Sequence, residues 1–153
     1  MNEIKLSGYL EDIRYSHTVN DIIYDKATLI VPRIKGEHDT LDIRFKRCSA
    51  MNVPEGKIQL TGTLRSYSKK LSETKNKVEI YVFTYFDSIN SETSEEITNK
   101  IMIDGRICKK ETLHQTKSGK NHLNMILANN LFIQDKNIKL NNYIPIVFWG
   151  RLV

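Results

Sequence analysis

The sequence predicts an all-β protein: one five-stranded Greek-key barrel followed by a second, incomplete copy of it. Segments rich in Ile, Val, Thr and aromatic residues fill the 153-residue chain, and helical periodicity is absent. One strand pattern, alternating apolar residues followed by a polar residue and a glycine, occurs at residues 4–10, 58–64 and 101–107. Such a glycine permits the bend or bulge of a tightly curved strand, and a small barrel needs two such strands. Three copies therefore indicate one and a half domains.

The first repeat is expected to hold a complete barrel. Its strands are predicted over residues 3–15, 26–33, 40–47 and 57–86, the last range containing a kinked strand and its return. Residues 49–56 connect the third strand to the fourth, where barrels of this type carry a short helix. Pro54 and Gly56 would end that helix after one turn.

The second repeat follows a polar, acidic segment. Residues 91–97 contain three Glu and no basic residue, which is typical of a solvated linker. We therefore predict a first domain over 1–90, a linker over 91–97 and a second repeat over 98–153. Its strands are expected at 100–110, 121–130 and 143–149, with no residues left for a fourth and fifth. An unpaired edge would remain, so we expect either a C-terminally truncated tandem protein or completion of the half barrel by another chain.

Composition narrows the class of function. The net charge is +5, and residues 98–153 hold nine Lys and Arg against three Asp and Glu, which favours a polyanionic partner. No run approaches the roughly 18 apolar residues of a membrane span, and no secretion signal opens the chain, so a cytoplasmic protein without membrane contact is expected. Cys48 and Cys108 are interpreted as reduced thiols.

No catalytic or metal site is expected. The four histidines share no spacing, no Gly-rich phosphate loop occurs, and no carboxylate pairs with a base in a recognisable motif. The prediction is a binding protein that is not an enzyme and needs no cofactor or metal.

Four segments of the second repeat resemble the bacterial single-stranded DNA-binding proteins, in the same order and at similar spacing. They are residues 103–107, 115–120, 127–130 and 143–151, and the Thr-x-Ser-Gly turn and the Val-Phe-Trp strand are the distinctive parts. The first repeat is similar to a diverged copy, and the whole chain resembles the tandem variety, with two OB-fold barrels in one polypeptide. The resemblance implies the OB-fold, single-stranded DNA as partner, and a homodimer that supplies four OB-type units. The acidic tail with which the family recruits partners is not recognised here.

Three aromatic residues are candidates for stacking on bases. The resemblance places a stacking aromatic at Trp149, and strand alternation puts Phe148 on the opposite face, so one of the two is expected in the core. Core packing or a subunit contact is the alternative role for Trp149. Tyr67 and Tyr15, each at the end of a kinked strand, are the first-repeat candidates.

Basic residues are predicted to bind phosphates as clusters. The loop between the fourth and fifth strands supplies Lys69, Lys70, Lys75 and Lys77. The second repeat supplies Arg106, Lys109, Lys110, Lys117, Lys120 and Arg151. Arg14, Arg33, Arg44 and Lys46 are the first-repeat counterparts. A lysine-rich hairpin tip also protects an exposed edge from pairing, which is the alternative interpretation of the loop.

Non-sequence-specific binding and protection of single-stranded DNA, in replication, recombination, repair or DNA transfer, is the leading hypothesis. The alternative is an OB-fold assembly module of a replication or recombination complex with weak or no DNA binding, which the near-neutral first repeat favours. RNA binding of the cold-shock type fits less well, because aromatics are not densely interleaved on two adjacent strands.

Overall fold

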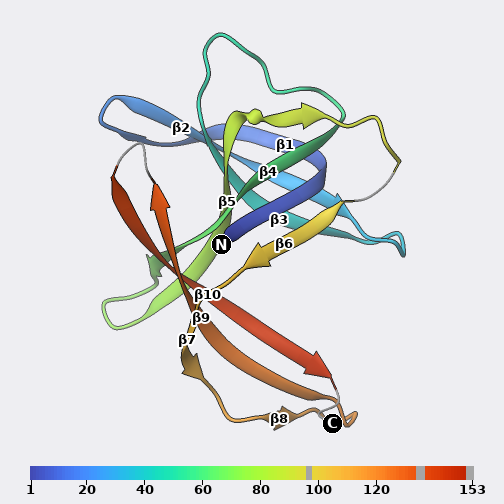
Figure 1. Ribbon diagram of the computed structural model, residues 1–153, viewed down its shortest axis with the longest axis vertical. Coiled ribbons are helices and arrows are strands. Elements are labelled where there is room, and N and C mark those ends of the chain that lie inside the picture. Colours follow the sequence, from blue (N-terminus) through green and yellow to red (C-terminus); the bar gives the residue numbers. More distant parts are fainter. Residues whose placement is uncertain (96–97, 134–136, 151–153) are drawn as a thin grey trace. The chain divides into compact units, whose positions relative to one another are not determined.

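The protein is described by a computed structural model, which covers residues 1–95, 98–133 and 137–150 (Figure 1). The chain divides into two compact units. The barrel unit comprises Asn2–Leu64 and Ile80–Met102, and the basic unit comprises Met1, Arg65–Glu79 and Ile103–Val153. The division into residues 1–90, 91–97 and 98–153 stays a prediction. The compact units differ from it in placing Arg65–Glu79 with the second repeat.

Strands form all the regular structure of the described residues. They are β1 (Asn2–Val19), β2 (Ile22–Pro32), β3 (His38–Lys46), β4 (Lys57–Lys70), β5 (Asn76–Ser91), β6 (Asn99–Ile103), β7 (Arg106–Lys110), β8 (His114–Gln115), β9 (Asn121–Ile133) and β10 (Ile138–Gly150). The all-β prediction is confirmed, and most strands run longer than predicted.

The barrel unit contains a closed five-stranded barrel. Its strand order is β2-β3-β5-β4-β1, and β1 also pairs with β2, which closes the sheet on itself (Figure 1). The β3–β5 ladder is parallel, with Ile43 opposite Val82, and the ladders of β1 with β2, β1 with β4 and β2 with β3 are antiparallel. Strand β6 extends the sheet beyond β1. The connection between β1 and β2 is a two-residue turn in which Asn20 and Asp21 both have positive φ, as a type I′ hairpin requires.

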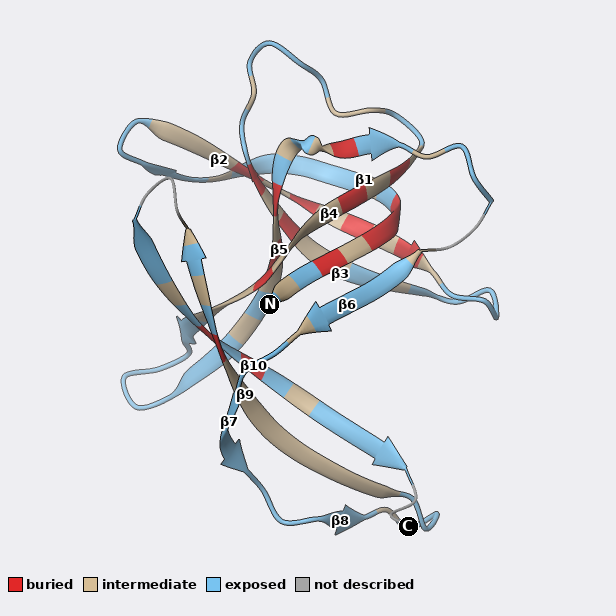
Figure 2. Ribbon diagram, viewed as in Figure 1, coloured by how far each residue is buried: buried red, intermediate tan, exposed pale blue. Residues whose placement is uncertain are grey.

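Buried residues recur along the strands of the barrel unit (Figure 2), and most of them are apolar. The fully buried side chains include Ile4, Leu29, Ile43, Phe45, Ile58, Leu60 and Val82. Because successive residues of a strand point to opposite faces, the intervening positions face outward and are free to carry other chemistry.

The three repeated glycines mark places where a neighbouring backbone passes very close. A Cβ atom added at Gly8, Gly62 or Gly105 would collide with the carbonyl oxygen of Ile30, Phe83 or Ala128, respectively. Each glycine therefore permits a close approach of adjacent strands, which a small barrel needs.

The bulge of β1 lies beyond its glycine. Gly8 pairs in regular register with Ile58, whereas the register with β2 shifts between Glu11 and Arg14, and Asp12 has a φ of 56°. The bulge expected of this strand is therefore present beyond the glycine, near Asp12, where it adds local twist.

The prediction of a short helix between the third and fourth strands is wrong. Residues 47–56 contain no helix but a turn at Ser49 and Ala50, and a cavity of about 540 Å³ lined by Phe45, Met51 and Phe86, among others, lies beside this connector. The physical reason is its composition: Pro54 lacks an amide donor, Gly56 has a φ of 81°, and too few residues remain to nucleate a helix.

The basic unit contains an antiparallel sheet of order β10-β9-β7, with β8 paired to β9. Strands β9 and β10 remain in register from Ile133 and Ile138 to Asn121 and Gly150. The tip of the β4–β5 hairpin belongs to the same unit. There Ser66 receives a hydrogen bond from the Tyr143 amide at 2.7 Å and donates its own amide to Asn142 Oδ1 at 3.2 Å.

The strand predicted over residues 100–110 is divided at Asp104 and Gly105 into β6 and β7. Asp104 donates its amide to the Met1 carbonyl at 3.1 Å, and its own carbonyl accepts the side-chain amide of buried Asn129 at 2.8 Å. These bonds take the place of ladder pairing at the break.

Candidate nucleic-acid interface

The two compact units differ in net charge more than the two sequence repeats do. The basic unit holds 13 Lys and Arg against five Asp and Glu, whereas the barrel unit holds 10 against 13. The difference arises because the lysine-rich hairpin tip Arg65–Glu79 groups with β7, β9 and β10. A polyanion would therefore be attracted to the basic unit.

One face of the β9–β10 ladder carries the predicted stacking residue. Alternation along β10 places Trp149, Val147, Pro145 and Tyr143 on this face, and the register puts them opposite His122, Asn124, Ile126 and Ala128 of β9. Trp149 is 62% exposed and Tyr143 is 47% exposed. We call this surface the β9–β10 face. Tyr143 was not predicted, although its even spacing from Trp149 would have revealed that they share a face.

The expectation that either Trp149 or Phe148 is a core residue is wrong. Phe148 lies on the opposite face, on the same side of the strand as buried Ile144, but it is itself 52% exposed. Both rings at this end of the ladder are therefore exposed. Alternation correctly separated the two rings but could not reveal that both faces are open.

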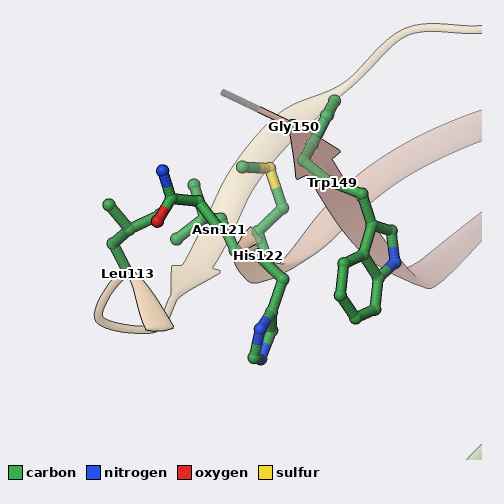
Figure 3. A pocket seen from close by; sticks show the side chains of 8 residues that line it. Leu113, Asn121, His122, Trp149 and Gly150 are labelled. Carbon is green, nitrogen blue, oxygen red and sulfur yellow. The ribbon is translucent and has the colours of Figure 1, made fainter. Parts of the chain in front are cut away.

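Trp149 is the end member of a row of three rings that crosses the sheet. His114 of β8 pairs with His122 of β9, which pairs with Trp149 of β10. The ring centroids of His114 and His122 are 5.3 Å apart, and those of His122 and Trp149 are 5.0 Å apart. Figure 3 shows His122 and Trp149 side by side on the wall of a cavity of about 350 Å³. Sequence reasoning missed both histidines, since only strand register brings them together.

Cationic side chains flank the aromatic ones on the β9–β10 face. Arg106 is opposite Ala128, in one cross-strand row with Tyr143, and Lys109 is opposite Ile126, in one row with Pro145. A second cavity of about 220 Å³ is lined by Lys109, Asn124, Pro145 and Val147, among others. Glu111 also lines it and accepts a hydrogen bond from the Asn124 side chain at 3.0 Å. Rings and cations thus share one surface.

The other basic candidates of this unit lie at strand ends or in the connections between strands. Lys69, Lys70, Lys75, Lys77, Lys110, Lys117 and Lys120 are all exposed. The Thr116–Gly119 turn is closed by the Gly119 amide, which donates to the Thr116 carbonyl at 2.9 Å, and Gly119 has a φ of 83°. Tyr67 is half-buried on β4, and Arg151 lies outside the described residues.

Three of the four basic candidates in the barrel unit already contact carboxylates, and Lys46 is exposed. The ion pairs join Arg14 to Asp12, Arg33 to Asp39 and Glu37, and Arg44 to Asp42. Hydrogen bonding to Asp39 raises the pKa of Arg33, and the same bond lowers the pKa of Asp39. These partners compete with phosphate, so the role of the arginines stays a prediction.

The barrel unit carries an aromatic cluster that was not predicted. Tyr24 stacks on His17 at 4.8 Å, Phe83 lies 6.3 Å from Tyr24, and Tyr85 packs edge-on against Phe83 at 5.4 Å. Alternation of Phe83 and Tyr85 with buried Thr84 puts them on the outer barrel surface. By contrast, the predicted Tyr15 is exposed and its hydroxyl bonds to Thr18 at 2.8 Å.

Neither a membrane-spanning helix nor a metal-binding cluster occurs among the described residues. No helix in this part of the chain has the length and apolar character needed to cross a bilayer. No group of three or more His, Cys, Asp or Glu in the described ranges could hold a metal ion.

A closed five-stranded Greek-key barrel with this strand order is an OB-fold, and the predicted fold class is confirmed. Residues 98–153 match the model of the Single-strand binding protein family. This match supports the stated resemblance over the second repeat. The family is one of binding proteins, in agreement with the prediction that the chain is not an enzyme.

Two solved structures of one bacterial protein show the same fold. The crystal structure of the wild-type single-stranded DNA binding protein from Thermus aquaticus superposes with a TM-score of 0.67 at 16% identity, covering 97% of this chain and 74% of that one. A deletion mutant of that protein carrying R190A gives a TM-score of 0.67 at 17% identity, covering 97% and 75%. The N-terminal domain of PriB from Thermoanaerobacter tencongensis gives 0.45 at 23% identity, covering 65% and 96%. No curated protein matches the chain.

Proposed function

We propose that this protein binds single-stranded DNA without sequence preference and protects it during replication, recombination, repair or DNA transfer. The observation that carries the proposal is the β9–β10 face, where exposed Trp149 and Tyr143 share one surface with Arg106 and Lys109. Every base presents a π-face, so stacking on such rings is tolerant of sequence, while cations beside them contact the backbone. The family match over residues 98–153 supports the same conclusion.

The exposed lysines supply the phosphate contacts in this proposal. Four lie on the hairpin tip Arg65–Glu79, in the same compact unit as the β9–β10 face. Binding that releases counterions weakens as salt rises, so the affinity should depend steeply on ionic strength. The aromatic cluster around Tyr24 and Phe83 is proposed as a further stacking surface in the barrel unit.

We further propose that the chain acts in the cytoplasm as a homodimer with four OB-type units. The resemblance to the tandem variety of the family supports this arrangement. The partner class is single-stranded DNA, and no membrane contact is included in the proposal.

Fluorescence of Trp149 tests the proposal directly, because it is the only tryptophan in the chain. Addition of oligo(dT) at low salt should quench this emission, and the dissociation constant should rise as salt is added. Absence of binding at low salt, or an affinity that ignores salt, would refute the proposal.

An assembly module with weak or no DNA binding is the second candidate function. The acidic balance of the barrel unit, 10 basic against 13 acidic residues, favours it. Trp149→Ala separates the two functions when the variant is measured both by oligonucleotide binding and by gel filtration. Loss of binding with an intact oligomer supports the first function, and loss of the oligomer supports the second.

A further inference from the structure

A bulge in β7 puts a carboxylate on the β9–β10 face. The ladder of β7 with β9 slips by one residue at Cys108. Strict alternation from Arg106, which is on this face, would turn Glu111 to the opposite one, because the two are an odd number of positions apart. The bulge reverses this outcome, and the Glu111 amide donates to the Asn124 carbonyl at 3.0 Å. Bulges commonly re-aim side chains in this way beside functional sites.

The Glu111 carboxylate is held by an amide and not by a cation. Asn124 Nδ2 donates to Glu111 Oε2 at 3.0 Å, and no ion pair to Glu111 occurs among the described residues. An ionised carboxylate only accepts hydrogen bonds, so the side chain of Asn124 presents its nitrogen to it. Glu111 Oε1 and Asn124 Oδ1 remain as acceptors with no partner in the part of the chain that the structure describes. The pair therefore offers two acceptors to a ligand.

This pair lines the cavity of about 220 Å³ on the β9–β10 face, and the remaining lining is mostly apolar. Pro145 and Val147 of β10 supply apolar surface, and Lys109 adds a cation. Asn124 and Val147 form the cross-strand row next to that of Trp149, so the cavity adjoins the stacking residue. Apolar walls with a few polar groups are typical of ligand sites, and here they lie beside the position proposed for a stacked base.

We propose that the Glu111–Asn124 pair selects a base with an exocyclic amino group, such as cytosine, for the position next to the base stacked on Trp149. The inference rests on the proposed function and adds one base-selective position to a surface that otherwise accepts any sequence. An exocyclic amino group has two protons for the two acceptors, and a carboxylate readily accepts from cytosine N4. Uracil and thymine offer one N–H with a carbonyl on either side, and those carbonyls repel the acceptors.

The expected preference is modest because the pair is exposed to water. From the usual net contribution of a hydrogen bond to a charged group, reduced for this exposure, we expect oligo(dC) to bind about threefold to tenfold more tightly than oligo(dU). Oligo(dU) is the matched comparison, because uracil has the same ring as cytosine and lacks the methyl group of thymine.

Two charge-matched substitutions test the contact from the protein side. Glu111→Gln keeps the shape of the side chain but presents an amide that can rotate to donate or accept, so the ratio of the oligo(dU) and oligo(dC) dissociation constants should fall by about the same threefold to tenfold. Glu73→Gln, at an exposed position of the hairpin tip, is the control. Both variants remove one negative charge from the basic unit and should bind oligo(dU) more tightly, but Glu73→Gln should leave the ratio unchanged.

A change in the oligonucleotide tests the same contact without altering the protein. An oligomer of 2-pyrimidinone deoxyriboside, with hydrogen in place of the amino group of cytosine, should bind as weakly as oligo(dU). Fluorescence anisotropy at pH 8 and constant ionic strength gives each dissociation constant. An unchanged ratio in Glu111→Gln, or a 2-pyrimidinone oligomer that binds as tightly as oligo(dC), would overturn the inference and leave the proposed function standing. No binding of any of these oligonucleotides at low salt would overturn both.

Discussion

Replacing Trp149 by Leu removes the aromatic face but keeps an apolar side chain at the end of β10. The indole is 62% exposed, and its contact with His122 occupies one side, so the structure leaves one face for one base. Stacking of a single base on an aromatic side chain contributes about 1–3 kcal/mol. Because every 1.4 kcal/mol is tenfold in affinity, the dissociation constant should rise by roughly 5-fold to 150-fold.

Anisotropy of a fluorescein-labelled oligo(dT) is the appropriate assay, since the variant lacks the intrinsic fluorophore. Phe148→Leu is a closely matched control: it removes a neighbouring ring that is 52% exposed but lies on the opposite face of the strand. A substitution away from the binding face should change affinity by no more than about twofold. The reasoning is refuted if Trp149→Leu binds within twofold of the unaltered protein, or if Phe148→Leu weakens binding equally.

Three further outcomes are expected. Replacing the four lysines of the hairpin tip by Gln should reduce the slope of log affinity against log salt by about 0.7 for each phosphate that is no longer neutralised, and an unchanged slope would exclude the tip from the interface. Gly62→Ala should lower the free energy of unfolding by about 1–3 kcal/mol, because its Cβ would meet the Phe83 carbonyl, whereas Gly150→Ala, whose Cβ would meet no atom of the described residues within 4 Å, should be nearly neutral in urea denaturation. The hydrogen bond from Arg33 lowers the pKa of Asp39, so this carboxylate stabilises the fold above the ordinary aspartate pKa of about 3.9, and that stability is lost as the pH falls through the lower folded-state pKa. Asp39→Asn should therefore lose less stability than the unaltered protein on acidification, and identical acid dependence would contradict this.

The residue pattern along each strand was sufficient to predict the fold, because each barrel strand carries its own alternation of apolar and polar residues. Alternation identified the strands, and the glycines at positions 8, 62 and 105 marked the close approaches between them. Local pattern failed at the connector before β4, where the expectation of a helix came from barrel architecture and not from the residues present. Pro54 and Gly56 were interpreted as the end of one helical turn, whereas in the structure no helix precedes them.

The candidate site was only partly predictable. Trp149 was found from the resemblance, whereas Tyr143, His114 and His122 were not, because their relation to Trp149 is set by the register of β8, β9 and β10. The aromatic cluster around Tyr24 and Phe83 was not predicted for the same reason, since these two residues lie on strands far apart in the chain. The site in each unit is made by neighbours across strands, which spacing along one strand does not reveal.

By itself, the sequence determined that the chain is all-β, that an OB-fold barrel opens it, and that the second repeat carries the family signature and most of the excess positive charge. Those properties follow from alternation, turn residues and composition, all of which are local. Only the tertiary structure decided that the hairpin tip Arg65–Glu79 groups with the second repeat and that Trp149 ends a row with two histidines. Strand register and unit packing depend on contacts between distant residues, so they emerge only when the whole chain is folded.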